Sequence, residues 1–154
     1  MAAKGCRPRS GGRTRYEWLY VYGYARPATG QTFTVILPRV NVGRMADALA
    51  AFAAHADPDG KKVLVLVVDN AGWHRAKRLA VPGNVRLHFL PPCTPELQPV
   101  EPYWALVREA VANEAFDRLA DLRRVIRRRC RRLAGDRATV LGAVGFRWAA
   151  WMER

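Results

Sequence analysis

Residues 63–69, with the sequence Val-Leu-Val-Leu-Val-Val-Asp, decide the fold class of this chain. Six consecutive aliphatic residues predict a β-strand that is buried on both faces, within a strand expected over residues 61–69. The strand delivers Asp69 at its carboxyl end, and ligands and metal ions bind at this edge of open α/β sheets. The sequence therefore predicts an α/β domain with a carboxylate at the binding edge of its sheet.

A second carboxylate, Glu101, follows another predicted strand, over residues 84–90, and a proline-rich turn, residues 91–101, with the sequence Pro-Pro-Cys-Thr-Pro-Glu-Leu-Gln-Pro-Val-Glu. Prolines restrict φ and exclude helix, so we expect the turn to hold the backbone at Glu101 in one conformation. A helix is expected from about residue 98 or 99, because proline suits a first helical turn. We expect separate elements to bring Asp69 and Glu101 to one edge of the sheet.

Two carboxylates at one edge are typical ligands for a hard divalent cation. Mg²⁺ is usually held by one or two carboxylates together with substrate phosphates. In phosphodiester cleavage, two such ions about 3.5–4 Å apart polarise the attacking and leaving oxygens. Zinc is not expected, because the three histidines are scattered and no Cys/His pair has ligand spacing. An acid after a strand is also common as a helix cap or a surface residue, so the two positions alone leave both interpretations open.

The chain carries several sequence blocks in a specific order: Asp69-Asn70-Ala71-Gly72-Trp73-His74, Val81-Pro82, Leu90-Pro91-Pro92, Pro95 to Glu101, and Trp104. These blocks resemble the catalytic domain of DDE transposases of bacterial insertion sequences, of the mariner-like group with an RNase H-like fold. The resemblance continues more weakly from about residue 16 to the end. It implies that Asp69 and Glu101 are the second and third catalytic carboxylates of the family and hold Mg²⁺ or Mn²⁺. Asn70 and His74 match the same motif, which implies that they support the metal ligand or contact DNA.

The chain departs from the family at the first of its three catalytic carboxylates, which should lie on a strand before the aromatic segment that starts at Tyr16. Nothing before Tyr16 resembles a strand, and Glu17 falls on the second strand of the family order. The resemblance therefore implies an RNase H-like mixed sheet flanked by helices and truncated before its first strand. We also expect this chain to lack the helix-turn-helix region with which the family recognises transposon ends. A decayed copy, a second reading frame joined by frameshifting and a misannotated start all remain open.

The composition favours a nucleic-acid partner. The chain has 154 residues and a formal net charge of +13, which suits one domain that binds a polyanion, although basic residues also serve ordinary surface solubility. The three cysteines form no Cys-x-x-Cys pair, so reduced thiols in a cytosol are expected. No apolar run is long enough for a membrane span, and the basic N-terminus lacks the apolar segment of a secretory signal.

The elements before the central strand follow from local patterns. Residues 1–15 are predicted to be a basic flexible segment or an arm on a phosphate backbone, and residues 16–154 a partial catalytic domain with C-terminal helices from about residue 98. Alternating aromatic residues over 16–25 and the run 31–37 predict a β-hairpin. A helix starts at Asn41 or Gly43 and ends at a turn over residues 57–60. Residues 71–79 are expected to form a short helix or turn.

The C-terminal half is predicted to be helical. Asp117 is expected to cap a helix with one apolar face formed by Leu119, Leu122, Ile126, Cys130 and Leu133. An arginine cluster lies largely away from that face and is either a solvated surface or a phosphate-contacting one: Arg123, Arg124, Arg127, Arg128 and Arg131. A last helix is expected over residues 138–151.

The resemblance implies DNA transposition as the function. The complete enzyme would hydrolyse a DNA strand at an element end and direct the freed 3′-hydroxyl at target DNA, in a bacterial cytoplasm near the nucleoid. Its partners would be DNA and the N-terminal part of the transposase, with a homodimer as a further option. We expect this chain alone to be inactive in strand transfer. The alternatives are a non-catalytic DNA-binding remnant and an RNase H-like nuclease of another kind, which would need a third acid.

Overall fold

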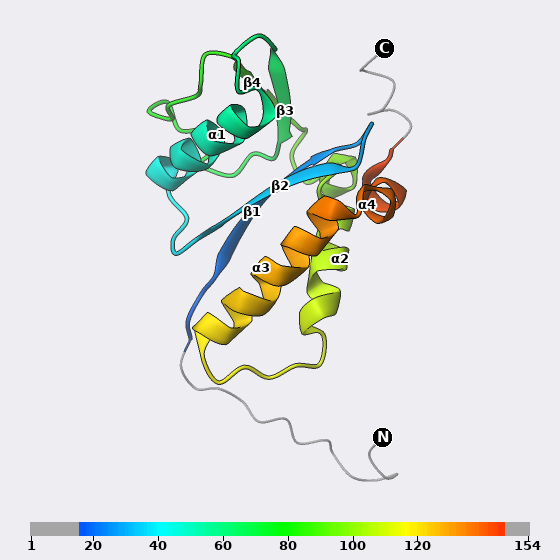
Figure 1. Cartoon of the computed structure of the whole chain (residues 1–154). Helices are drawn as coiled ribbons and strands as arrows, with labels where there is room; N and C mark the ends of the chain where they lie inside the picture. The colour runs from blue at the N-terminus through cyan, green and yellow to red at the C-terminus, as the bar shows by residue number, and fades with distance from the viewer. Residues whose placement is uncertain (1–15, 147–154) are drawn as a thin grey trace, which may run out of the picture.

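The structure is a computed structural model that describes residues 16–146, and in these residues it has a mixed α/β architecture (Figure 1). The segments expected over residues 1–15 and after residue 146 lie outside the described residues. The elements follow in the order β1 (Tyr20–Arg26), β2 (Gln31–Leu37), α1 (Val42–Ala56), β3 (Leu64–Val68), β4 (Val85–Phe89), α2 (Glu101–Arg108), α3 (Leu119–Gly135) and α4 (Arg137–Val144), with short 3₁₀ helices at Pro95–Leu97 and Glu109–Val111.

The predicted hairpin is confirmed: β1 and β2 are antiparallel, with a register from Tyr20 opposite Leu37 to Arg26 opposite Gln31. Its turn ends at Gly30, whose φ of 67° favours glycine. A side chain at Gly30 would also collide with the backbone of α4, so the hairpin tip packs closely on that helix. The position of Glu17 differs from the prediction, because Glu17 precedes β1 and is not part of a strand.

Helix α1 begins as predicted, because Oδ1 of Asn41 accepts a hydrogen bond from the backbone N–H of Arg44 at 2.8 Å. It ends at the expected turn, where the carboxylate of Asp57 is buried. This carboxylate accepts from the backbone N–H groups of Lys61 and Lys62 and from Nδ2 of Asn84. The pKa of Asp57 is held below its usual value, chiefly by the hydrogen bond from Lys62. Asp57 is therefore a structural residue that joins α1 to the segment before β4.

Strands β3 and β4 form a parallel pair, with Leu64 opposite Val85 and Val68 opposite Phe89. The expectation that β3 is buried on both faces is wrong in one respect: Leu64 and Leu66 pack against the core under α1, but the side chain of Val65 is 59% exposed. The expected single mixed sheet is also divided, because the hairpin and the parallel pair form two separate two-stranded sheets in the described residues. No neighbouring strand pairs with the outer edge of β3 in the described residues.

The C-terminal helices depart from the prediction in detail. The N-cap of α3 is Arg118 instead of the expected Asp117. Residues 71–79 form turns, which is one of the two forms expected for them. The fully buried anchor of α2 is Tyr103, with Trp104 only partly buried. The hydroxyl of Tyr103 lies 3.2 Å from Oγ1 of Thr34, and burial is the main reason that its pKa is raised to about 12. The expected apolar face of α3 is largely confirmed, with Ile126, Cys130 and Leu133 buried.

The hairpin separates two apolar clusters. One cluster lies among α2, α3, α4 and the hairpin face that carries Val21 and Ala25. The other lies among α1, β3, β4 and the opposite hairpin face, which carries Tyr22 and Tyr24. In Figure 1 the helices α2 to α4 accordingly lie on one side of the hairpin, with α1, β3 and β4 on the other. Among the described helices, none has the length and apolar character that a membrane span requires.

Candidate functional site

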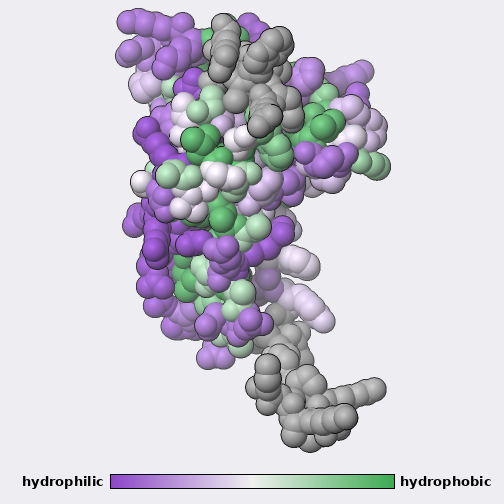
Figure 2. Space-filling view, turned by 90° about the vertical axis from the view of Figure 1, so that its right-hand side faces the viewer, coloured by the Kyte–Doolittle hydropathy of each residue, from purple (hydrophilic) through white to green (hydrophobic). Residues whose placement is uncertain are grey.

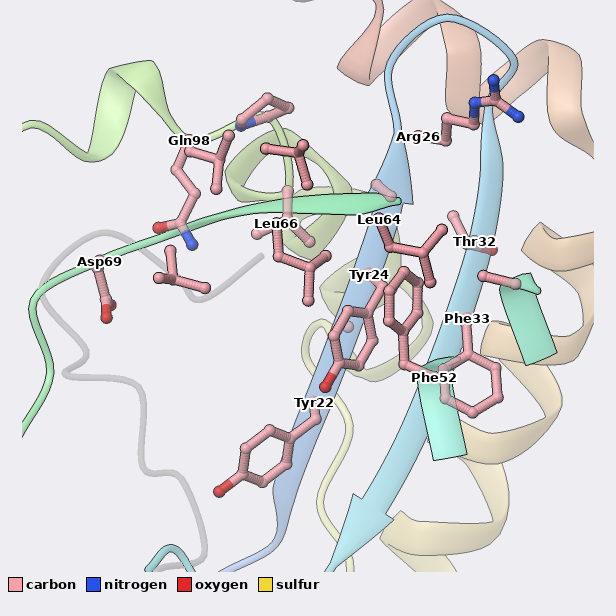
Figure 3. A pocket seen from close by; sticks show the side chains of 18 of the residues that line it. Tyr22, Tyr24, Arg26, Thr32, Phe33, Phe52, Leu64, Leu66, Asp69 and Gln98 are labelled. Carbon is pink, nitrogen blue, oxygen red and sulfur yellow. The ribbon is translucent and has the colours of Figure 1, made fainter. Parts of the chain in front are cut away.

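A cavity of about 910 Å³ holds the two candidate carboxylates. It is lined by β1, by β3 with the residue that follows it, Asp69, and by the segment from Gln98 to Glu101. Figure 3 shows Asp69 and Gln98 toward one end of this cavity and the tyrosines of β1 on another side. Asp69 and Glu101 thus line one cavity from two separate elements, the end of β3 and the start of α2.

Asp69 follows the last residue of β3 directly, and only one of its two carboxylate oxygens has hydrogen-bond partners in the described residues. Oδ1 accepts from the backbone N–H of Ala71 at 3.0 Å and from Nδ1 of His74 at 2.6 Å. Oδ2 has no hydrogen-bond partner within residues 16–146, and 55% of the Asp69 side chain is exposed. One oxygen is therefore fixed by the protein while the other is open to an ion or a solvent molecule.

The hydrogen bonds of His74 define its tautomer. Its Nε2 accepts a hydrogen bond from Nε1–H of Trp73 at 3.1 Å, so Nε2 carries no proton. Nδ1 therefore carries the proton of the neutral ring and donates it to Asp69. Only 14% of the His74 side chain is exposed. This arrangement orients the Asp69 carboxylate, as partners of metal-binding side chains commonly do.

Asn70 connects the ends of the two parallel strands. Its Nδ2 donates to the backbone oxygen of Leu90 at 2.5 Å, and its Oδ1 accepts from Nη1 of Arg75 at 3.1 Å. The guanidinium of Arg75 also lies 5.6 Å from the ring centroid of Phe89 at the end of β4. Both polar ends of the Asn70 side chain thus have partners inside the protein, which fixes the backbone immediately after Asp69.

Glu101 is the first residue of α2, and the turn before it is built from local hydrogen bonds. Oγ1 of Thr94 donates to the backbone oxygen of Pro91 at 2.7 Å, and the N–H of Glu101 donates to the backbone oxygen of Gln98 at 3.0 Å. Cys93 has a φ of 59°, so the turn includes a left-handed residue. These contacts set where α2 begins and therefore where Glu101 leaves the backbone.

Gly23 supports the same helix, and the sequence patterns did not single it out. A Cβ atom on Gly23 would come within 2.5 Å of the indole of Trp104, which lies one turn after Glu101. The indole therefore rests directly on the β1 backbone. The available signal was a glycine inside an otherwise aromatic strand, because such glycines often mark a close approach.

The donor set fits a divalent metal ion only in part. Asp69 and Glu101 supply exposed carboxylate oxygens of the kind that Mg²⁺ and Mn²⁺ bind. Over the described range, however, no three or more His, Cys, Asp or Glu side chains gather into a potential metal site. Glu17 does not line the cavity and so does not contribute the third acid. Within the described residues, the cavity therefore offers two carboxylates and room for further ligands.

The arginine cluster lies on a different surface. Its five members are exposed on α3, which contributes nothing to the cavity lining: Arg123, Arg124, Arg127, Arg128 and Arg131. Arg124 pairs with Asp121, and the other four have no ion-pair partner in the described part of the chain. Figure 2 shows that hydrophilic residues prevail over one face of the molecule, with hydrophobic residues in scattered groups. The structure does not bring the cluster into contact with the two acids.

Comparison with known proteins places Asp69 and Glu101 within one matched region. The family model described as DDE superfamily endonuclease matches residues 1–123, which include both carboxylates. An uncharacterized protein, y4pE/y4sA of Sinorhizobium fredii (strain NBRC 101917 / NGR234), is 37% identical over 106 residues. The match covers 68% of this chain and 77% of that protein. No solved structure matches the chain.

Proposed function

We propose a transposase function for this chain on the premise that it belongs to the family of DDE superfamily endonucleases. In this proposal it forms part of a mariner-like catalytic domain with an RNase H-like fold, acts on insertion-sequence DNA in the cytoplasm, and contributes to strand cleavage and strand transfer. The single observation that carries the proposal is that Asp69 and Glu101 line one cavity, from the end of β3 and the start of α2.

The roles of the residues follow from their contacts. Oδ2 of Asp69 and the carboxylate of Glu101 would hold Mg²⁺ or Mn²⁺, which supplies Lewis-acid polarisation of phosphate oxygens when bound. His74 holds Oδ1 of Asp69 and keeps the carboxylate in one orientation. Asn70 fixes the backbone on which Asp69 sits. The indole of Trp104 against Gly23 holds the first turns of α2 and with them Glu101.

The third carboxylate of the family would come from the N-terminal part of the transposase, as a partner segment of this chain. The exposed arginine cluster on α3 would contact DNA phosphates. Residues 16–154 would then be one portion of the catalytic domain, and residues 1–15 an additional basic arm. With two of three acids, the chain alone would show little or no strand transfer.

Metal binding tests the core of this proposal without requiring activity. Binding of Mn²⁺ is followed by calorimetry in the wild type and in Asp69→Asn and Glu101→Gln. We expect each substitution to weaken binding by about tenfold or more. Glu96→Gln is the matched control, because Glu96 is exposed and does not line the cavity. Equal affinity in all four proteins would contradict the assignment. Cleavage of labelled element ends by the isolated chain, lost in Asp69→Asn, would contradict the expected inactivity alone.

A non-catalytic DNA-binding role is the second candidate function. It is favoured by the separation of the arginine cluster from the cavity and by the lack of a third acid near Asp69 and Glu101 among residues 16–146. Steep salt dependence of DNA binding with no effect of Mg²⁺ would support it. An increase in DNA affinity on addition of Mg²⁺ that Asp69→Asn removes would support the catalytic role instead.

A further inference from the structure

The turn that follows Asp69 carries basic residues that belong neither to the cavity lining nor to the arginine cluster on α3. No aspartate or glutamate occurs in residues 70–95, whereas Arg75, Lys77 and Arg78 lie close together in this turn. All three are exposed, and none has an ion-pair partner in the part of the chain that the structure describes. Positive charge that no acid offsets, next to the candidate metal site, attracts an anionic ligand.

Of these basic residues, Arg75 is held in place by two contacts. Its Nη1 donates a hydrogen bond to Oδ1 of Asn70 at 3.1 Å, and its guanidinium carbon lies 5.6 Å from the centroid of the Phe89 ring. Asn70 is fixed in turn, because its Nδ2 donates to the backbone oxygen of Leu90. A guanidinium held by an amide and an aromatic ring has little freedom left to lose when it binds a ligand.

The same two contacts leave most of the Arg75 donors free. A guanidinium carries N–H groups on each of its nitrogens, and Asn70 accepts from Nη1 alone. The remaining N–H groups have no hydrogen-bond acceptor among residues 16–146, because the contact with Phe89 is with the ring. A planar guanidinium fork matches two oxygens of one phosphate, to which it donates parallel hydrogen bonds. The arrangement of Arg75 therefore suits a phosphate group.

Arg75 is anchored at the edge of the sheet that carries Asp69. Strands β3 and β4 are parallel, and their last residues, Val68 and Phe89, lie opposite each other. Asp69 follows β3 directly, and the next residue, Asn70, holds Arg75. Consecutive Cα atoms are about 3.8 Å apart, so the metal ligand and the anchor of Arg75 are neighbours in space. A polymer with regularly spaced phosphates is able to reach both positions.

We propose that Arg75 binds a backbone phosphate of DNA that flanks the phosphate at the Asp69 site, and that Asn70 and Phe89 position its guanidinium for this contact. The inference rests on the proposed function for the identity of the polymer, and adds a residue that fixes where the strand crosses the edge of the sheet. Arg75 does not line the cavity, so it holds a flanking phosphate and not the one that the metal ions would polarise.

NMR of the full chain without metal tests this contact directly. The Nε–H signal of Arg75 is assigned by its loss in Arg75→Lys, and the probe is a thymidine dinucleotide with a single phosphodiester. We expect the probe to shift this signal in a saturable way. The matched control is the Nε–H signal of Arg86, which should not move. Arg86 is also exposed and also held, by the backbone oxygens of Gly83 and Val85, but it lies near the opposite end of β4.

The affinity for a longer strand measures how much the contact contributes. Fluorescence anisotropy with a labelled single-stranded oligonucleotide, in the presence of EDTA, compares the wild type with three variants. We expect Arg75→Gln to weaken binding by about tenfold or more, because hydrogen bonds to charged groups contribute strongly. Arg75→Lys keeps the charge but not the fork, so it should recover only part of the loss. Arg86→Gln should bind like the wild type, and circular dichroism checks the fold of each variant.

The proposal fails under any of three outcomes. The Arg75 signal does not shift at saturating dinucleotide, or it shifts equally with the methylphosphonate analogue, whose uncharged linkage would assign the contact to the bases. In the third outcome, Arg75→Gln and Arg86→Gln lose affinity equally, which would indicate a general effect of charge.

Calorimetry with Mn²⁺ separates this failure from failure of the proposed function. An unchanged Mn²⁺ affinity in Asp69→Asn and Glu101→Gln would contradict the proposed function even if the Arg75 signal shifts. A missing shift at Arg75, together with the expected loss of Mn²⁺ affinity in those two variants, would contradict the phosphate contact alone.

Discussion

Nδ1 of His74 lies 2.6 Å from Oδ1 of Asp69, five residues away across the turn that follows β3. Because Trp73 donates to Nε2 of the same ring, the imidazole presents its proton to the carboxylate and not to solvent. This contact leaves Oδ2 of Asp69 as the oxygen that is available to a ligand. The orientation of the proposed metal ligand thus depends on a histidine that itself need not touch the metal.

The first prediction concerns His74→Ala. Removing the imidazole frees Asp69 to rotate, so we expect the Mn²⁺ affinity to fall by about 10- to 100-fold while the chain stays folded. Calorimetric titration measures the affinity, and His88→Ala is the matched control, because His88 is exposed on β4 and does not line the cavity. His74→Gln, which keeps an N–H donor, should restore part of the loss. An unchanged Mn²⁺ affinity in His74→Ala would contradict the proposal that His74 orients Asp69.

The second prediction concerns Gly23→Ala, which places a methyl group against the indole of Trp104. Overpacking of this kind typically costs about 1–3 kcal/mol. We expect the free energy of unfolding in urea to fall by that amount, with Gly72→Ala nearly neutral because nothing lies within 4 Å of its added Cβ.

A double-mutant cycle identifies the cause of this loss. In the background of Trp104→Leu, the cost of Gly23→Ala should largely disappear, since the clash is with the ring. An equal cost in both backgrounds would assign the effect to the β1 backbone instead.

The third prediction is a pH dependence of stability that originates at Asp57. Its pKa is lower in the folded chain than in the unfolded one, chiefly because the Lys62 N–H donates to it. This carboxylate therefore stabilises the fold above its unfolded pKa of about 4, and the contribution is lost as the pH falls through the folded pKa.

Urea unfolding of the wild type and Asp57→Asn at several pH values measures this contribution. The stability difference between the two proteins should be largest near neutral pH and should shrink below about pH 4. Asp59→Asn, at an exposed position in the same turn, serves as the control and should show no such trend. A difference that does not vary with pH would mean that the lost contacts of Asp57 are not those of its charged form.

The fourth prediction concerns DNA binding by the arginine cluster. Arg127→Gln, Arg128→Gln and Arg131→Gln each remove an exposed charge without an ion-pair partner on the described chain. If these residues contact phosphates, each substitution should reduce the slope of log affinity against log salt by about one. Arg44→Gln, on α1 and paired with Asp47, is the control. Filter binding at several salt concentrations provides the slopes, and unchanged slopes in all three cluster variants would identify the cluster as a solvated surface.

The sequence by itself determined the local elements of this protein. Alternating aromatics, the Asn41 cap and the aliphatic run before Asp69 predicted the hairpin, α1 and β3 close to where they lie, because each pattern involves neighbours within a few residues. The same local reasoning failed at Asp117, because the N-cap of α3 is the neighbouring Arg118. It placed Asp69 after a strand and Glu101 at a helix start, which are also local properties.

Only the tertiary structure decided how these elements meet. It placed Trp104 on Gly23, paired His74 with Asp69, and divided the described strands into two sheets. The physical reason is that these features depend on which distant surfaces pack together and which backbone edges find partners. A strand pattern predicts that a residue packs against an apolar neighbour. It does not predict which part of the chain, or which chain, provides that neighbour.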